Sequence, residues 1–435
     1  MNLSKGTTNV SKLPLRPEFH FTPHQGWIND PLALTYKDGR YHLFYQYVPG
    51  STVWGPNCHW GHATSTDLMS WTEEGVAIAP GEGDDGIWSG SIAVHPETGD
   101  ATMFYTSVSV PDFGIGRVRQ AFPTDDTWNT WIKGDFVVDV PAELDTIAFR
   151  DPFVFRDGEK WRMLVGTGLR GGTAAATSFS ATDLNKWDYD GLAAQRSGSE
   201  TSQVWTGTLW ECPQIFEIDG RSVLVTSVWE DDVLHYVAYG IGTYEDGKFK
   251  AESWGQLTYG SGYYAPSFFR DKDGAPGLIF WIRGYLDETA GRASALSIPH
   301  RLRLIGNTLI SEPHPDLAAY EGSSDQGSEF HLAADNAYIL TWDGTEKASL
   351  QLIQEDVQQV TVTGKAGTLY IATGGDEQHI DHTHGRVTMI IDGPILELFT
   401  SRGTFALGSG LQADQKVTVD STAPVLVRQL SRKDE

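Results

Sequence analysis

The stretch NDPLALTYKDG at residues 29–39 repeats its layout twice further along the chain, as RDPFVFRDG at 150–158 and ECPQIFEIDG at 211–220. Each copy opens with a polar residue, continues as an apolar strand, and reaches Asp-Gly before a second strand-like run, at 40–45, 160–165 and 221–226. Asp-Gly between two such runs is a strong signal for a tight β-hairpin. The sequence therefore predicts the same hairpin at three places.

Two weaker copies, SGSIAVHPETG at 89–99 and YAPSFFRDKDG at 264–274, place the five turn glycines at 39, 99, 158, 220 and 274. The phrase TDLMSW at 66–71 returns as TDLNKW at 182–187, which agrees with a unit of about sixty residues. Units of short strands at this spacing are typical of four-stranded β-propeller blades. We expect five blades whose first strands line a central channel. The alternative for any single copy is that Asp-Pro marks only a turn.

The repeat of about sixty residues does not continue after the fifth unit. We expect an all-β protein, a five-bladed β-propeller followed by a C-terminal β-sandwich. The propeller is assigned to residues 1–312, a linker to 313–324 and the sandwich to 325–435. Within the linker, 316–320 is expected to form helical turns and 322–324 a loop. Sandwich strands are predicted at 349–353, 360–362, 367–372, 386–391 and 395–400.

Composition excludes several classes of function. Acidic residues number 57 against 32 basic ones, a formal net charge of −25, which repels nucleic acid and anionic membrane surfaces. The two cysteines, Cys58 and Cys212, form no disulfide framework and no zinc motif. No apolar run reaches the length of a membrane span, and residues 1–17 lack a signal-peptide core. We expect a cytoplasmic protein, or one secreted with a signal peptide absent from this chain.

Three carboxylates, Asp30, Asp151 and Glu211, recur in the same phase of the repeat and are predicted to meet in the channel. A retaining glycosidase needs two carboxyl groups about 5–5.5 Å apart, a nucleophile and a proton donor. Three like charges in one cleft raise at least one pKa. Glu211 stands between Trp210 and Cys212, a less polar setting that favours its acid form. The sequence therefore predicts Glu211 as the acid.

Aromatic side chains surround these segments, and flat rings stack on the apolar faces of sugars. Asn29, Gln46 and Arg150 are donors able to orient hydroxyl groups, and the loops at 81–86 and 111–117 are expected to rim the pocket. The alternative for any single aromatic residue is burial between blades. The aromatic candidates are Trp27, Trp54, Trp60, Trp88, Trp205, Trp210, Tyr263, Tyr264 and Trp281.

Histidines cluster in sequence near the first unit, at His20, His24, His59 and His62. Their spacing fits no zinc signature, although nearby acids suit calcium equally well. No phosphate loop, nucleophile elbow or dinucleotide fingerprint is found. We expect no metal and no cofactor.

Taken together, these segments resemble glycoside hydrolase family 32, the β-fructosidases that include invertases, inulinases and levanases. The matching phrases, in order, are HFTP (20–23), WINDP (27–31), FYQ (44–46), WGHA (60–63), WSGS (88–91), FRDP (149–152), WECP (210–213) and DGPILELF (392–399). The resemblance implies that Asp30 is the nucleophile, Glu211 the acid/base and Asp151 the transition-state stabiliser. It also implies that Asn29, Gln46, Trp54, Trp88 and Ser89 line the fructosyl subsite. Leu32-Ala33 departs from the Asn-Gly usual in the family.

We therefore expect a retaining enzyme that releases terminal β-D-fructofuranosyl units from sucrose or fructans, small carbohydrates, through a covalent fructosyl intermediate. The predicted substrate-binding residues are Trp27, Asn29, Gln46, Trp54, Trp88, Ser89, Arg150, Tyr264 and Trp281. One alternative is a fructosyltransferase on the same scaffold, including one that forms difructose anhydrides. Others are a non-catalytic sugar-binding propeller and an inverting arabinan-type hydrolase, whose carboxyl groups stand roughly 6.5–9.5 Å apart.

Overall fold

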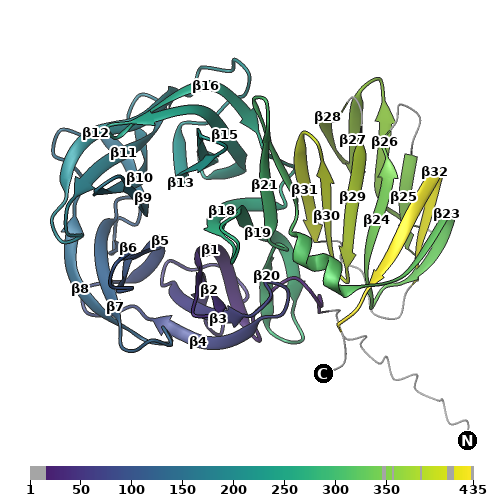
Figure 1. Ribbon diagram of the computed structural model, residues 1–435, viewed down its shortest axis with the longest axis horizontal. Coiled ribbons are helices and arrows are strands. Elements are labelled where there is room, and N and C mark those ends of the chain that lie inside the picture. Colours follow the sequence, from purple (N-terminus) through teal and green to yellow (C-terminus); the bar gives the residue numbers. More distant parts are fainter. Residues whose placement is uncertain (1–15, 345–348, 355–356, 383–384, 409–415, 433–435) are drawn as a thin grey trace, which may run out of the picture.

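The computed structural model describes residues 16–344, 349–354, 357–382, 385–408 and 416–432. In this part of the chain the secondary structure is β-strand except for one short 3-10 helix, η1 (Pro315–Tyr320). A ring of sheets fills one side of the molecule and a second β body stands beside it (Figure 1). The prediction that residues 1–17 lack a signal-peptide core concerns mostly residues 1–15, which lie outside the described residues.

The ring is a five-bladed β-propeller, as predicted, and each blade contains four antiparallel strands. Blades 1 and 2 contain β1 (Gly26–Lys37), β2 (Arg40–Val48), β3 (His59–Ser65), β4 (Thr72–Ile78), β5 (Gly86–Val94), β6 (Ala101–Val108), β7 (Arg117–Pro123) and β8 (Trp131–Val138). Blades 3 and 4 contain β9 (Thr146–Asp157), β10 (Lys160–Leu169), β11 (Thr173–Ala181), β12 (Asp188–Ser197), β13 (Leu209–Ile218), β14 (Arg221–Glu230), β15 (Val233–Glu245) and β16 (Lys248–Gln256). Blade 5 contains β18 (Tyr263–Arg270), β19 (Pro276–Asp287), β21 (His300–Ile305) and β22 (Thr308–Pro313). The first strand of each blade is nearest the centre of the ring (Figure 1).

The Asp-Gly hairpins explain why the unit repeats. All five predicted turn glycines adopt positive φ, from 59° at Gly158 to 84° at Gly39, and Asp38 and Asp219 before two of them are also left-handed. Two successive left-handed residues make the turn whose twist matches antiparallel strands, and Asp-Gly is a preferred pair for it. The repeated phrases at 66–71 and 182–187 form the connections from third to fourth strand in blades 1 and 3.

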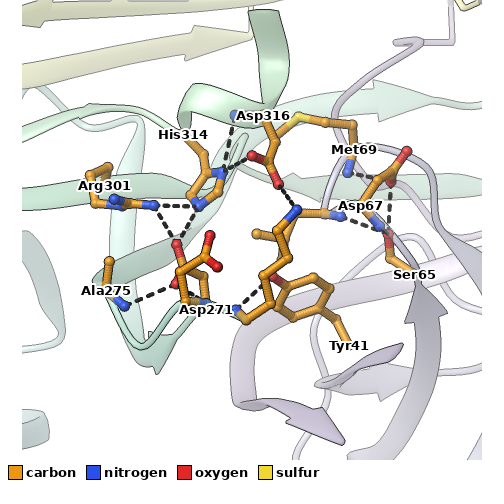
Figure 2. A network of polar contacts seen from close by, with 12 residues as sticks. Tyr41, Ser65, Asp67, Met69, Asp271, Ala275, Arg301, His314 and Asp316 are labelled. Carbon is orange, nitrogen blue, oxygen red and sulfur yellow. Dashed lines mark hydrogen bonds and ion pairs between the residues drawn. The ribbon is translucent and has the colours of Figure 1, made fainter. Parts of the chain in front are cut away.

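The ring closes partly through side chains, since β20 (Arg292–Leu296) pairs with β1 over only two residues. Figure 2 shows the polar network at this closure. The Asp271 carboxylate of blade 5 accepts from Arg301 and lies 3.2 Å from His314 Nε2. The backbone N–H of Lys272 donates to the Tyr41 hydroxyl of blade 1 at 2.9 Å. These contacts tie the last blade both to the first blade and to the segment that enters η1.

The second body is the predicted β-sandwich. Its strands are β23 (Glu321–Ala333), β24 (Ala337–Asp343), β25 (Ser349–Gln354), β26 (Val357–Lys365), β27 (Thr368–Thr373), β28 (Asp376–Asp381), β29 (Arg386–Asp392), β30 (Ile395–Thr400), β31 (Gly403–Gly408) and β32 (Lys416–Leu430). β32 pairs with β24 near its end and with β25 further back, so one long strand connects the two layers around the apolar core. A short propeller strand, β17 (Thr258–Tyr259), pairs with β31.

Between the two bodies the sequence prediction is partly wrong. The helical turns expected at 316–320 are confirmed by η1. Residues 322–324, expected to be a loop, belong to β23 instead, because the start of that strand pairs with the end of β32. The domain bounds at 312 and 325 stay a prediction.

Candidate active site

A cavity of about 660 Å³ opens at one end of the propeller channel; we call it the channel pocket. Every predicted site residue except Ser89 lines it. Its lining is Trp27, Asn29, Asp30, Gln46, Trp54, Trp88, Phe113, Gly114, Ile147, Ala148, Arg150, Asp151, Leu209, Glu211, Trp229, Asp232, Leu234, Tyr264 and Trp281. Ser89 is buried and contacts Asp30. The structure thus brings together all the residues on which the sequence prediction rests.

The inner strand of every blade departs from regular pairing at the same point. Register shifts follow Ile28 in β1, Trp88 in β5, Arg150 in β9, Glu211 in β13 and Tyr264 in β18. Such β-bulges re-aim side chains and are frequent next to active sites. They explain how two successive residues of one strand reach the same pocket.

The three carboxylates are not equivalent in the repeat, and the sequence prediction is wrong on this point. Asp30 and Asp151 each precede a proline, whereas Glu211 stands one residue earlier in its blade, with Cys212 before the proline. Cys212 and Asp151 share the left-handed conformation, with φ of 47° and 66°. The bulge after Glu211 still lets its side chain line the pocket.

Asp30 is held by three neutral donors. Its Oδ1 accepts from Asn29 at 2.9 Å, while its Oδ2 accepts from Ser89 at 2.5 Å and from Gln46 at 3.3 Å. Gln46 also donates to Ser89. Burial raises the pKa of Asp30, and Glu211 adds to the rise, although the bonds from Ser89 and Asn29 oppose it. The donors fix the carboxylate in position without pairing it to a cation.

Glu211 has a different environment. Its Oε1 accepts from Nε and Nη2 of Arg150 at 2.9 and 2.7 Å, and its Oε2 accepts from the Tyr264 hydroxyl at 2.7 Å. Trp210 points away into the core and donates to the carbonyl of Thr206. The less polar setting expected for Glu211 is therefore wrong, since a guanidinium and a hydroxyl both contact the carboxylate.

Asp151 is a second carboxyl group whose proton affinity the site raises. Burial and the negative charge of Glu211 raise the pKa of Asp151 to about 7, although Arg150 acts in the opposite direction. The backbone N–H of Cys212 donates to its Oδ2 at 2.9 Å. The rule that crowded like charges raise at least one pKa thus applies here, to Asp151 and to Asp30.

Cys212 is a site residue that the sequence reasoning did not place. Its Sγ lies 3.7 Å from Oδ2 of Asp30 and 3.6 Å from Oδ2 of Asp151. Burial and these carboxylates hold the pKa of the thiol well above its ordinary value. Cys212 therefore serves as a neutral spacer between two acids. The signal for it was present, because Cys212 occupies the position before proline that Asp151 occupies in blade 3.

Aromatic pairs form the walls of the pocket. Trp54 meets Trp88 edge to face at 5.7 Å, and Trp27 meets Trp281 at 5.8 Å. Trp54 is 47% exposed, which leaves much of its ring open at the rim. Among the other aromatic candidates, Trp60, Trp210 and Tyr263 are core residues, and Trp205 donates to the Gly198 carbonyl outside the pocket lining.

The two loops predicted to rim the pocket have different roles. Phe113 and Gly114 of the 111–117 loop line it, as expected. The 81–86 loop does not line it; its Asp85 accepts from the backbone N–H of Val110, the residue just before the other loop, at 2.7 Å. The turn between β14 and β15 adds Asp232, which the sequence reasoning missed.

The histidines that are close in sequence lie apart in the fold. His20 contacts Asp392 and Glu397, whereas His62 lies 3.1 Å from His42 Nδ1 and 2.9 Å from Asn129. Among the described residues, no group of three or more His, Cys, Asp or Glu side chains has the geometry of a metal site. No helix in the described ranges is long and apolar enough to cross a membrane.

Fold and site define a five-bladed β-propeller protein with an acidic, aromatic-walled pocket and an attached β-sandwich. The sequence profile of the glycosyl hydrolases family 32 N-terminal domain matches residues 20–313. The chain belongs to this family, and the resemblance predicted from the short phrases is confirmed.

Several relatives are similar over most of this chain. A sucrose-6-phosphate hydrolase of Zymomonas mobilis is 32% identical over 321 residues, which cover 68% of this chain and 61% of the relative. A levanase of Bacillus subtilis is 32% identical over 75% of this chain and 50% of the relative. The match therefore spans about three fifths or less of the length of these relatives.

Solved structures confirm the fold. The β-fructofuranosidase of Bombyx mori superposes with a TM-score of 0.84 and 25% identity, covering 96% of this chain and 94% of that chain. Fructan 1-exohydrolase IIa of Cichorium intybus gives a TM-score of 0.80 at 20% identity, covering 97% and 98%. The predicted propeller and sandwich are the architecture of these neighbours.

Proposed function

We propose that the protein is a retaining β-fructofuranosidase that hydrolyses terminal fructosyl units of sucrose or fructans. The observation that carries the proposal is the contrast between two carboxylates in one pocket. Asp30 is fixed by neutral donors, as a nucleophile requires, while Glu211 lines the same pocket and takes the proton-donor role from the family resemblance of its segment. Family membership and the names of the relatives support the same activity.

In the first step, an oxygen of Asp30 attacks C2 of the fructosyl unit while protonated Glu211 gives its proton to the departing glycosidic oxygen. The bond from C2 to that oxygen breaks, and a fructosyl ester of Asp30 forms. In the second step Glu211 takes a proton from water, whose oxygen attacks C2 and releases Asp30. Fructose leaves, and both carboxyl groups return to their starting states.

Asp151 and Arg150 are assigned to the fructose hydroxyls, and the remaining predicted residues to the walls of the subsite. Asp151 is 6% exposed and directly adjoins Cys212, so it is placed for a fixed, directional contact. With a pKa near 7, it is able to donate as well as accept a hydrogen bond, which suits a sugar hydroxyl.

The charges of the pocket favour neutral sugars over phosphorylated ones. Its lining has four carboxylates, Asp30, Asp151, Glu211 and Asp232, against the single guanidinium of Arg150. A phosphate dianion meets net repulsion there. Although several relatives are named sucrose-6-phosphate hydrolases, we propose sucrose and fructans as the substrates of this chain.

The test is a product assay on sucrose, sucrose 6-phosphate, inulin and levan, resolved by chromatography. Release of free fructose from the neutral sugars is expected, with near-complete loss in Asp30→Asn and in Glu211→Gln. Asp219→Asn is the matched control, because it removes one carboxylate from a hairpin turn outside the pocket lining. Accumulation of longer fructosyl products would instead indicate that the protein is a fructosyltransferase. Binding without turnover would indicate a non-catalytic sugar-binding propeller.

A further inference from the structure

Two motifs that the proposed chemistry does not use meet in the interior, at the junction of propeller and sandwich. The ring of His20, from the HFTP phrase, lies 2.7 Å from Asp392 Oδ2 and 2.5 Å from Glu397 Oε1. All three side chains are buried. Although burial disfavours its charge, Glu397 and Asp392 raise the pKa of His20 to about 9. The junction therefore holds an ionised cluster.

Glu397 is the centre of this cluster. Besides His20, it accepts from the backbone N–H of Ile298 at 2.8 Å and from the Tyr263 hydroxyl, and it lies 2.9 Å from His300 Nε2. Burial opposes ionisation, but His20 and His300 hold the pKa of Glu397 far below its ordinary value. A carboxylate with this many partners is a fixed point in the fold.

Tyr263 connects that fixed point to the channel pocket. It is the first residue of β18, the inner strand of blade 5, which pairs with β19 on one side only. The next residue, Tyr264, donates to Glu211 at 2.7 Å and lies 3.3 Å from the carbonyl of Val228. An inner strand without a second strand partner depends on side-chain contacts for its lateral position.

We propose that Tyr263 is a positioning residue for acid catalysis: anchored by Glu397 of the sandwich, it fixes β18 so that the Tyr264 hydroxyl stays on Glu211. The inference rests on the proposed function, in which Glu211 is the proton donor. The sandwich then contributes to catalysis in the propeller, because its Glu397 holds Tyr263 and the neighbouring Tyr264 holds Glu211.

The test compares two substrates that differ in their need for a proton. Sucrose has a leaving group that requires protonation, whereas 4-nitrophenyl β-D-fructofuranoside releases a phenolate that does not. Tyr263→Phe keeps the ring and removes the bond to Glu397. We expect kcat/KM for sucrose to fall about tenfold, less than the ~100-fold that a full 1 Å misplacement can cost. The nitrophenyl substrate is expected to change less than about twofold, by the same reasoning.

A double-mutant cycle tests whether Tyr263 acts through Tyr264. Tyr264→Phe alone is expected to reproduce the selective loss on sucrose, and adding Tyr263→Phe to it is expected to cause little further change. Tyr45→Phe is the matched control, because Tyr45 is fully buried and its hydroxyl has no hydrogen-bond partner in the part of the chain that the structure describes. Because both kcat/KM values are measured on the same sample, their ratio does not depend on the fraction of the protein that is folded.

Equal losses on both substrates in Tyr263→Phe, or additive losses in the double variant, overturn the inference and leave only a structural role. An inactive wild-type protein on both substrates overturns the proposed function, and the inference with it. A sucrose-selective loss that disappears in the Tyr264→Phe background supports the proposed positioning.

Discussion

Replacing Asp151 by Asn is expected to stabilise the protein, by an amount that grows as the pH rises. The pKa of Asp151 is raised to about 7 from its ordinary value of 3.8, so the folded state binds this proton more tightly than the unfolded chain. Stability from such a group is fully present below the unfolded pKa and is lost as the pH rises through the folded pKa. Asn keeps the acceptor for the Cys212 N–H and never ionises.

The size of the effect follows from the shift. A rise of about three pKa units corresponds to about 4 kcal/mol at ~1.36 kcal/mol per unit. With an unfolding entropy of about 2.1 cal/mol/K per residue and 435 residues, that free energy is equivalent to a Tm difference of about 4 °C. We expect almost no difference between Asp151→Asn and the wild type near pH 4, and the full difference above pH 8.

The assay is a series of thermal melts from pH 4 to pH 9 for the wild type, Asp151→Asn and Asp219→Asn. Asp219→Asn corrects for the loss of one negative charge from a chain of net charge −25. Activity on sucrose should be lost in Asp151→Asn alone, which checks that the substitution reaches the site. A Tm difference that is constant over the whole range refutes the reasoning, because it means that Asp151 has the same proton affinity in both states.

Three further predictions follow from other parts of the molecule. Trp54→Ala should raise KM for sucrose several-fold with little change in Tm, since this ring is 47% exposed at the rim; steady-state kinetics and a melt check both. The pKa of His20 is raised to about 9 from its ordinary value of 6.5. The stability that the protonated ring contributes is therefore fully present below its unfolded pKa and is lost as the pH rises through 9. The wild-type Tm should fall over this pH range, and the Tm of His20→Asn should not. Asp232→Asn should raise the ratio of kcat/KM for sucrose 6-phosphate over sucrose several-fold, whereas Asp219→Asn should leave it unchanged.

Much of the propeller could be predicted from the sequence because its signal is local. Four of the five turn glycines follow an aspartate, so these turns depend on two residues each, and all five glycines have the positive φ that such turns need. The strand pairing of the sandwich was harder to predict. β23 and β32 are long strands whose pairing partners lie about a hundred residues apart in the chain, and that pairing leaves no short-range pattern. From the sequence alone, residues 322–324 are therefore predicted to be a loop, although they belong to β23.

The candidate site was predicted residue by residue but not in its electrostatics. Asp30, Asp151 and Glu211 do line one pocket, because a propeller gathers its inner strands. Which carboxyl groups have a raised pKa depends on side-chain partners from other blades. Arg150, from β9, pairs with Glu211 of β13, and no pattern within either segment predicts this pair. Cys212 was missed although its position before the proline was visible in the sequence, because its contacts with Asp30 and Asp151 come from other blades.

The bulges shared by the five inner strands have a consequence for how the pocket is built. At each bulge two neighbouring residues line the pocket or contact a residue that does, so each blade contributes a dipeptide to the site. Four of these dipeptides, Asn29-Asp30, Trp88-Ser89, Arg150-Asp151 and Glu211-Cys212, supply the acids and their closest partners. In the fifth, Tyr264-Ala265, the alanine packs against Cys212 in a small apolar cluster. Ala265 is 1% exposed, has a φ of 44° and is not part of the pocket lining, so the fifth dipeptide contributes only its tyrosine to the pocket.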